Sequence, residues 1–509
     1  MKKTILILLL INYNIFAQGY RYVDSIFTPI QSYTDITYAT APELNAPYLG
    51  ESSTHSSELK FNLFEPQGDT LNNRPLIIFA HGGAFISGTK ENDDMMEFSR
   101  IFAAKGYVTA TIQYRLGMNA ASSVSGERSV YRALQDSRAA IRYFKEKAAT
   151  YKIDTNYVYF LGSSAGAFMA LHNLFMNEEN ERPAGSFKIS HIPPTLDDGP
   201  DLGTLDSIEP QYVHGANADA IISLWGALQD TTLIKTTDNG RPVLLVHGTA
   251  DNVVPFNVGS PFNLPVFPPT YGSNPINKRM SNLGFEKETY FVPGQGHEFY
   301  GVSNGNWNPA PNAYWDTVVT KSTYFLWNIH KPTADFTYQN SNGNQVTFTD
   351  KSIGADAWLW NFGDGSSSTQ QNPVHTYLNG QYTVTQKVFN KIRSWDTTSV
   401  TFSIIVNGIG DEKNFPAEFV LEQNYPNPFN PSTTIKYSIQ KESQVSLIIY
   451  NLLGEQVEIL FNGIQSAGYY STNWNALNFP SGVYFSQIKA VSVTNNVIFT
   501  DVKKLVLMK

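Results

Sequence analysis

The stretch that decides the fold is YVYFLGSSAGAFMALH, residues 157–172. An apolar, β-rich run ends at Gly162, a turn of small residues carries Ser164, and an apolar pattern with helical spacing follows. Such a strand, sharp turn and helix are the context in which a G-x-S-x-G motif, here residues 162–166, presents its serine as a nucleophile. A side chain at Gly162 or Gly166 would crowd the flanking strand and helix. Because the same five letters also occur in ordinary Ser/Gly-rich loops, other parts of the chain have to support this prediction.

The composition indicates an exported globular protein of several domains. A chain of 509 residues exceeds one ordinary core, and roughly two to four domains are expected. Its net charge of -8 provides no basic footprint, so we expect no nucleic-acid partner. The absence of cysteine excludes disulfides, thiolate metal sites and a cysteine nucleophile.

The first residues resemble an export signal. Lys2 and Lys3 precede a short apolar run, and Ala17 ends the segment, which predicts a secretory signal peptide over residues 1–17. The apolar run is too short for a membrane anchor, and no later segment is long and apolar enough to span a bilayer. We therefore expect no transmembrane segment in the mature chain.

Buried strand patterns alternate with helical patterns through the first two thirds of the chain. The apolar runs of residues 75–80, 157–162 and 242–246 are typical of strands covered on both faces. Helical spacing between such runs predicts an α/β fold with a doubly wound, mostly parallel sheet. Residues 177–217 interrupt the alternation with a Pro, Gly and Asp-rich stretch, which is typical of a segment that lines a site or forms a lid.

Three residues that follow predicted strands form a candidate catalytic triad. The carboxyl ends of parallel strands meet at one edge of a sheet, so Ser164, Asp251 and His297 can converge there. We expect Ser164 as nucleophile, His297 as general base and Asp251 as the carboxylate that orients the histidine. His297 could instead be a surface-loop histidine and Asp251 part of an Asx turn. Glu298 and Asp230 are weaker rivals for the acid role.

The HGGA turn after the strand at residues 75–80 is a candidate oxyanion hole. The backbone amides of Gly83 and Ala84, together with that of Ala165, are the expected donors to the oxyanion. The alternative is an ordinary glycine turn that ends a strand. His81 is expected to shape this turn rather than to react, and His247 to be a packed, hydrogen-bonded histidine.

The motifs HGGAF (residues 81–85), GSSAG (residues 162–166) and HGTAD (residues 247–251) resemble those of the carboxylesterase and lipase branch of the α/β hydrolases. That branch includes bacterial esterases that attack small esters and acylated plant polysaccharides, and the resemblance covers residues 34–327. It implies hydrolysis through an acyl-enzyme, with neither a cofactor nor a metal. Ala84 stands where hormone-sensitive-lipase-like members carry a third glycine, but a backbone amide from alanine can still donate.

Two β-rich segments follow, and short alternating strands predict a β-sandwich for each. Residues 333–407 contain WNFGDG at 360–365 and resemble a PKD domain, with Asn361 where that family often has Asp. This implies a spacer or adhesion module. Trp358 and Trp360 could form a carbohydrate platform or belong to the core.

The last segment, residues 415–509, follows a linker at 408–414 and resembles a type IX secretion C-terminal sorting domain. The resemblance rests on the proline-rich start NYPNPFNP, the glycine turns and the Lys-rich end. It implies that the type IX secretion machinery passes the chain from the periplasm through the outer membrane.

Together these observations predict a catalytic domain over residues 18–332 that is secreted or attached to the cell surface. The expected function is a serine carboxylic-ester hydrolase, and the expected substrate is an extracellular ester, short-acyl or linked to a polysaccharide. A serine peptidase of the same fold and a non-catalytic surface adhesion protein are the alternatives.

Overall fold

The computed structural model describes residues 20–238, 240–340, 343–405, 416–492 and 498–508. The predicted signal peptide (1–17) and linker (408–414) lie outside the described residues. The chain divides into two compact units, Met1–Lys331 with Lys391–Ser394, and Pro332–Asn390 with Trp395–Lys509. Each unit is built on its own buried apolar side chains.

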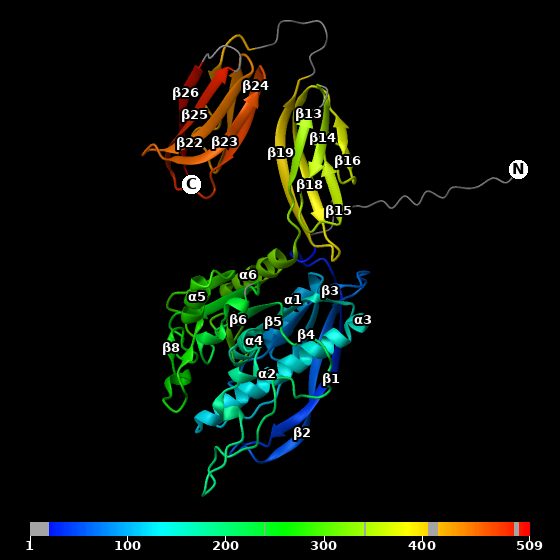
Figure 1. Cartoon of the computed structure of the whole chain (residues 1–509), viewed down its shortest axis with the longest axis vertical. Helices are drawn as coiled ribbons and strands as arrows, with labels where there is room; N and C mark the ends of the chain where they lie inside the picture. The colour runs from blue at the N-terminus through cyan, green and yellow to red at the C-terminus, as the bar shows by residue number, and fades with distance from the viewer. Residues whose placement is uncertain (1–19, 239, 341–342, 406–415, 493–497, 509) are drawn as a thin grey trace, which may run out of the picture. The chain divides into compact units, whose positions relative to one another are not determined.

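One sheet of eight strands organises the described part of the first unit, in the order β1-β2-β4-β3-β5-β6-β7-β10 (Figure 1). The pairs β1–β2 and β2–β4 are antiparallel, whereas all pairs from β4 to β10 are parallel. The strands are β1 Ile30–Leu44, β2 Thr54–Pro66, β3 Arg74–Ala80, β4 Val108–Ile112, β5 Ile153–Ser163, β6 Ala220–Leu224, β7 Val243–Gly248 and β10 Lys287–Val292. This arrangement confirms the predicted doubly wound, mostly parallel sheet.

Helices cover both faces of this sheet. The helices are α1 Asp93–Ala104, α2 Ser123–Glu146, α3 Ala148–Tyr151, α4 Ala165–Phe175, α5 Ser273–Asn282 and α6 Ala313–His330. Buried side chains of α2, α4 and α5 share one core with Leu76 and Ile78, and those of α1 and α6 share the other with Ile77 and Phe79. Successive residues of β3 therefore point to opposite cores, which explains its continuous apolar sequence.

The turns that follow β3, β5, β7 and β10 lie at the carboxyl edge of the parallel strands. They contain the HGGA turn, Ser164, Asp251 and His297, respectively. Strand direction alone thus brings segments more than two hundred residues apart in sequence to one edge.

The insertion at residues 177–217 is fastened to helix α2. Arg128 Nη1 donates to Gly185 O at 2.8 Å, and its Nη2 donates to Pro200 O at 2.7 Å. Gln135 Nε2 donates to Leu202 O at 2.9 Å. Arg128 Nε also pairs with the buried carboxylate of Glu51 at 2.7 Å. The Arg128 guanidinium is therefore hydrogen-bonded to Glu51 as well as to the insertion.

The PKD segment forms two antiparallel sheets, β13-β14-β17 and β16-β15-β18-β19. Its strands are β13 Phe336–Asn340, β14 Gln345–Asp350, β15 Ala357–Asn361, β16 Ser367–Ser368, β17 Val374–Thr376, β18 Gly380–Phe389 and β19 Trp395–Ile404. Trp360 is fully buried in its core, whereas Trp358 is only partly buried. Asn361 Oδ1 accepts from Gly363 N at 2.9 Å, so asparagine forms the turn of the WNFGDG motif.

The sorting segment also consists of two sheets, β20-β21-β24 and β23-β22-β25-β26. Its strands are β20 Val420–Leu421, β21 Ser432–Ile439, β22 Ser443–Asn451, β23 Gln456–Gln465, β24 Gly468–Asn475, β25 Gly482–Ser492 and β26 Ile498–Leu507. Asn427, in the proline-rich start, donates to Lys504 O at 3.0 Å and accepts from Val506 N at 2.9 Å. The start and end of this segment are thereby tied together.

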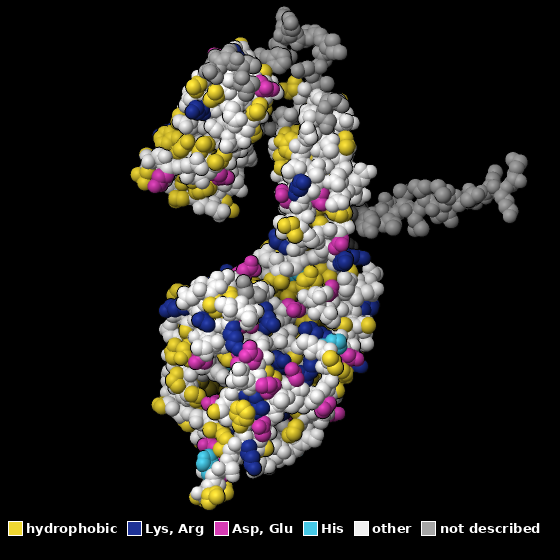
Figure 2. Space-filling model, in the orientation of Figure 1, with side chains coloured by type: hydrophobic (Ala, Val, Ile, Leu, Met, Phe, Trp, Pro, Cys, Tyr) yellow, Lys and Arg dark blue, Asp and Glu magenta, His cyan; other side chains and the backbone are white. Residues whose placement is uncertain are grey.

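On the visible face of the first unit, Lys and Arg side chains are interspersed with Asp and Glu (Figure 2). Within the described residues, no helix is both long and apolar enough to cross a bilayer.

Candidate active site

Ser164, His297 and Asp251 form one continuous chain of hydrogen bonds. His297 Nε2 lies 2.9 Å from Ser164 Oγ, and His297 Nδ1 lies 2.7 Å from Asp251 Oδ2. The side chain of Asp251 is fully buried, and that of His297 is 13% exposed. An ionised carboxylate only accepts hydrogen bonds, so Nδ1 carries the proton and Nε2 is left to accept from Ser164.

The turn at Ser164 is as tight as the motif requires. A Cβ added to Gly162 would lie 2.0 Å from Gly166 O, and one added to Gly166 would lie 2.3 Å from Ala80 O. Ser164 itself has φ 52°, a left-handed conformation that is strained for any residue other than glycine. The strain projects the hydroxyl out of the strand–helix junction toward His297.

Asp251 receives hydrogen bonds on both carboxylate oxygens. Its Oδ1 accepts from Val253 N at 2.8 Å and Val254 N at 2.9 Å. Its Oδ2 lies 3.2 Å from His247 Nε2 as well as 2.7 Å from His297. Burial by itself would raise the pKa of Asp251, but the hydrogen bonds from His247 and His297 outweigh burial and hold the pKa well below its usual range. Sequence reasoning placed His247 as a packed histidine, but gave no sign that it bonds the acid.

The two rival acids are engaged elsewhere. Glu298 accepts from Asn304 N at 2.6 Å and Gly305 N at 3.1 Å, within the loop that carries His297. Asp230 accepts from Thr232 N at 2.7 Å as the cap of a short 3₁₀ helix. Of the three candidate acids, the structure places Asp251 in contact with His297.

The HGGA turn lies directly against Ser164. A Cβ on Gly82 would approach Ser164 Cβ to 3.3 Å, and Gly166 N donates to His81 O at 3.1 Å. Gly83 and Ala84 have φ values of 107° and 54°. In the described part of the chain, the amides of both residues donate to no backbone acceptor. The N–H of Ala165, the first residue of α4, likewise has no partner inside its own helix.

His81 is a buried residue that stabilises the HGGA turn. Its ring is fully buried, stacks on Tyr114 with centroids 4.3 Å apart, and Nδ1 lies 2.7 Å from Gly82 O. Burial lowers the pKa of His81 to about 4, despite the opposing effect of the hydrogen bond to Gly82. His81 is therefore a neutral donor to Gly82 O and fits the structural role predicted for it.

The loop after His297, residues 297–307, is anchored on the N-terminus of α1. Tyr300 Oη donates to Asp94 Oδ2 at 2.8 Å, and Asp94 N donates to Gly305 O at 3.1 Å. Asp94 is fully buried, and burial raises its pKa to about 8 against the lowering effect of the Tyr300 hydrogen bond. The position of His297 thus depends on an acid that the sequence patterns did not indicate.

Asp94 should make the protein less stable as pH rises. The folded state keeps the Asp94 proton up to a pKa of about 8, whereas the unfolded chain loses it near 3.8. Between these values the folded state binds more protons, so the free energy of unfolding falls by at most about 1.4 kcal/mol per pH unit. Asp94→Asn keeps an acceptor for Tyr300 and cannot titrate. In urea unfolding of the full chain, the variant should lose less stability than wild type between pH 5 and pH 8; equal losses would contradict the assignment.

An apolar cavity of about 100 Å³ opens beside Ser164. It is lined by residues from the HGGA turn, α2, α4 and the segment between β8 (Val258–Gly259) and β9 (Thr270–Tyr271), among them Phe85, Gly126, Phe168 and Phe267. No residue of the insertion lines it. Gly126 and Phe267 belong to no motif. Phe85 and Phe168 lie in or beside the HGGAF and GSSAG motifs, but those motifs do not indicate that their side chains line one cavity.

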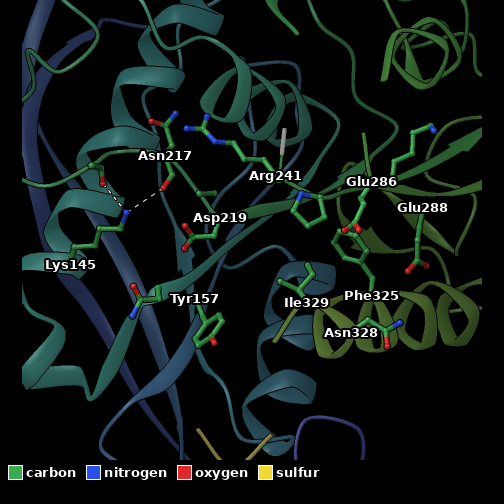
Figure 3. A pocket seen from close by; sticks show the side chains of 16 residues that line it. Lys145, Tyr157, Asn217, Asp219, Arg241, Glu286, Glu288, Phe325, Asn328 and Ile329 are labelled. Carbon is green, nitrogen blue, oxygen red and sulfur yellow. Dashed lines mark hydrogen bonds between the residues drawn. The ribbon is translucent and has the colours of Figure 1, made fainter. Parts of the chain in front are cut away.

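A larger, more polar cavity of about 840 Å³ lies at the opposite ends of the same strands (Figure 3). Asp219 and Pro242 immediately precede β6 and β7 there. Lys145 Nζ donates to Gly215 O at 2.9 Å, and Asp219 Oδ2 accepts from Val158 N at 2.8 Å. None of the predicted catalytic residues lines this larger cavity, so cavity size does not identify the catalytic site in this chain.

Family models match three parts of the chain. Residues 61–263 match BD-FAE, residues 329–404 match the PKD domain, and residues 423–506 match the secretion system C-terminal sorting domain. The chain contains an esterase-type α/β-hydrolase domain. The resemblances to an α/β-hydrolase, a PKD domain and a type IX sorting domain are therefore confirmed.

Similar proteins include Gut esterase 1 of Caenorhabditis elegans, 28% identical over 23% of this chain and 21% of the relative. Carboxylesterase 3 of Homo sapiens is 35% identical over 18% of this chain and 16% of the relative. The chain thus spans about a fifth of the length of these curated relatives. Among solved structures, esterase 2 of Thermogutta terrifontis phosphorylated by paraoxon is similar with a TM-score of 0.40, 19% identity, and coverage of 57% of this chain and 95% of that one.

Proposed function

We propose that the hydrolase domain is a serine carboxylesterase in which Ser164 is the nucleophile, His297 the general base and Asp251 the orienting acid. The observation that carries the proposal is the unbroken hydrogen-bond chain through the three side chains, at 2.9 and 2.7 Å. The amides of Gly83, Ala84 and Ala165 are the proposed oxyanion donors, because Ala84 and Ala165 line one cavity with Ser164 and, among the described residues, the three N–H groups have no backbone acceptor.

The reaction follows from these positions. Ser164 Oγ attacks the ester carbonyl while its proton passes to His297 Nε2, and negative charge develops on the carbonyl oxygen facing the amides. When the tetrahedral intermediate collapses, the ester C–O bond breaks and His297 returns the proton to the leaving alcohol. Water, activated by His297 in the same way, then attacks the acyl-enzyme and releases the carboxylic acid with Ser164 restored. Asp251 holds the imidazole in the required tautomer throughout.

The proposed substrate is an extracellular ester with a short acyl group, either a small ester or one linked to a polysaccharide. The apolar cavity beside Ser164 supports a small acyl group, and the attached PKD domain supports action on a polymer outside the cell. Ser164→Ala is the variant that tests the assignment. Assaying short-chain esters and peptides on the purified chain separates this proposal from a serine peptidase, because only a peptidase would also cleave the peptides efficiently.

We also propose that the type IX machinery exports the chain and delivers it to the medium or the cell surface. The sorting domain supports this proposal. Deleting residues 415–509 should leave the protein in the periplasm, because the machinery then lacks its recognition segment. Cell fractionation with an esterase assay in the lysate measures both properties. Normal export of the truncated chain would refute the proposal, whereas loss of esterase activity would show that the deletion damages the hydrolase.

A further inference from the structure

The apolar cavity lies on one side of Ser164 only. Ser164, Ala84 and Ala165 all line it, but His297 does not. In the reaction proposed above, His297 must hand a proton to the leaving alcohol, so the alcohol part of the ester lies on the histidine side. The cavity on the other side is then left for the acyl chain.

The size of the cavity limits that chain. Its volume of about 100 Å³ is smaller than the ~150 Å³ apolar cavity that is known to hold benzene. With the carbonyl carbon held at Ser164 Oγ, a cavity of this size favours a short acyl chain over a long one.

A glycine inside a helix forms part of the wall. Gly126 lies in the first turns of α2, where glycine costs about 1 kcal/mol relative to alanine. A Cβ at this position would lie 3.4 and 3.6 Å from two ring atoms of Phe267. Any larger side chain at Gly126 would therefore occupy cavity space or displace the Phe267 ring.

Phe267 is held in place from the opposite side. It is 4% exposed and belongs to the segment between β8 and β9. Figure 1 labels β8, and Figure 2 shows apolar side chains at the same place on the surface. Phe262 N in the same segment donates to Val253 O at 2.7 Å, and Tyr271 exchanges backbone hydrogen bonds of 2.8 and 2.9 Å with Leu228. Helix α2 and this segment thus pack against each other at Gly126 and Phe267 and form one anchored wall of the cavity.

We propose that the apolar cavity binds the acyl group of the ester, and that Gly126 and Phe267 together restrict it to short chains. This inference rests on the proposed esterase function. It assigns specificity to two residues that do not take part in the proton transfers.

Two substitutions with opposite expected effects test the assignment in the full-length chain. Gly126→Val should lower kcat/KM for p-nitrophenyl butanoate at least tenfold relative to the acetate, because each excluded methylene is worth about 10-fold or more. Phe267→Ala should raise the octanoate-to-acetate ratio about tenfold, because removing the ring opens this wall of the cavity. Gly215→Val is the matched control, since an added Cβ there would meet only Lys145 Nζ, at 3.9 Å, at the opposite end of the sheet. Its chain-length profile should equal that of wild type.

The readouts separate the two hypotheses. Acetate hydrolysis and covalent labelling of Ser164 by a fluorophosphonate report the proposed function and the integrity of each variant. If wild type hydrolyses no ester, the proposed function fails. If wild type is active but Gly126→Val and Phe267→Ala both keep its chain-length profile, the esterase stands and the acyl assignment is overturned.

Discussion

Ser164→Ala should abolish ester hydrolysis, lowering kcat on p-nitrophenyl acetate by a factor on the order of 10⁶. The loss follows because no other hydroxyl replaces Ser164 Oγ at 2.9 Å from His297 Nε2. The remaining amides can stabilise an oxyanion, but water must then attack without a bound nucleophile. Single-turnover and steady-state assays on the purified chain, together with loss of fluorophosphonate labelling, measure the effect.

The neighbouring serine provides a matched control. Ser163 is fully buried, and its Oγ accepts from Trp225 Nε1 at 3.0 Å, whereas Ser164 Oγ is the hydroxyl at His297 Nε2. Ser163→Ala should therefore retain most of the activity while losing some stability. Substantial ester hydrolysis by Ser164→Ala would contradict the assignment of the nucleophile. A comparable loss of kcat in a folded Ser163→Ala variant would contradict it as well.

Asp251→Asn should lower kcat by about 10⁴. The oxygen of the new amide would stay with Val253 N and Val254 N, leaving its NH₂ group against the donors of His247 and His297. His297 would relieve the clash by moving its proton to Nε2, and it could then no longer accept the Ser164 proton. The pH–rate profile and kcat on p-nitrophenyl acetate measure this change.

Asp230→Asn is the matched control for this substitution. An asparagine at Asp230 still accepts from Thr232 N, so activity and stability should remain close to wild type. A loss below tenfold in Asp251→Asn would contradict the acid assignment and return attention to Glu298.

The sheet and the order of the candidate triad could be predicted because they depend on local patterns. Apolar runs mark strands that are buried on both faces, and strand direction then places every following turn at one edge. The same patterns favoured Asp251 as the acid but could not exclude its two rivals. Asp251, Glu298 and Asp230 all follow plausible elements, and only the path of each backbone shows which carboxylate meets His297.

The apolar cavity could not be predicted at all. Gly126, Phe168 and Phe267 belong to separate elements, and each looks like an ordinary helix or loop residue in its own segment. The role expected for residues 177–217, lining a site or forming a lid, stays a prediction. A weak, polar pattern marks a segment without regular structure, but it does not show that Arg128 and Gln135 fasten this segment to α2.

The anchoring of the histidine loop on α1 affects where the protein can open without unfolding. Ser164 follows the central strand β5, whereas His297 follows β10, which lies at the edge of the described sheet and pairs there with β7. Edge strands open locally at lower free energy than central ones, so a base held by β10 alone would be the first catalytic group lost to fluctuation. Asp94, in α1, accepts a hydrogen bond from Tyr300 and donates one to Gly305, and these two bonds attach the histidine loop to α1. Amide exchange in residues 298–305 should consequently follow the opening of α1 rather than the fraying of β10.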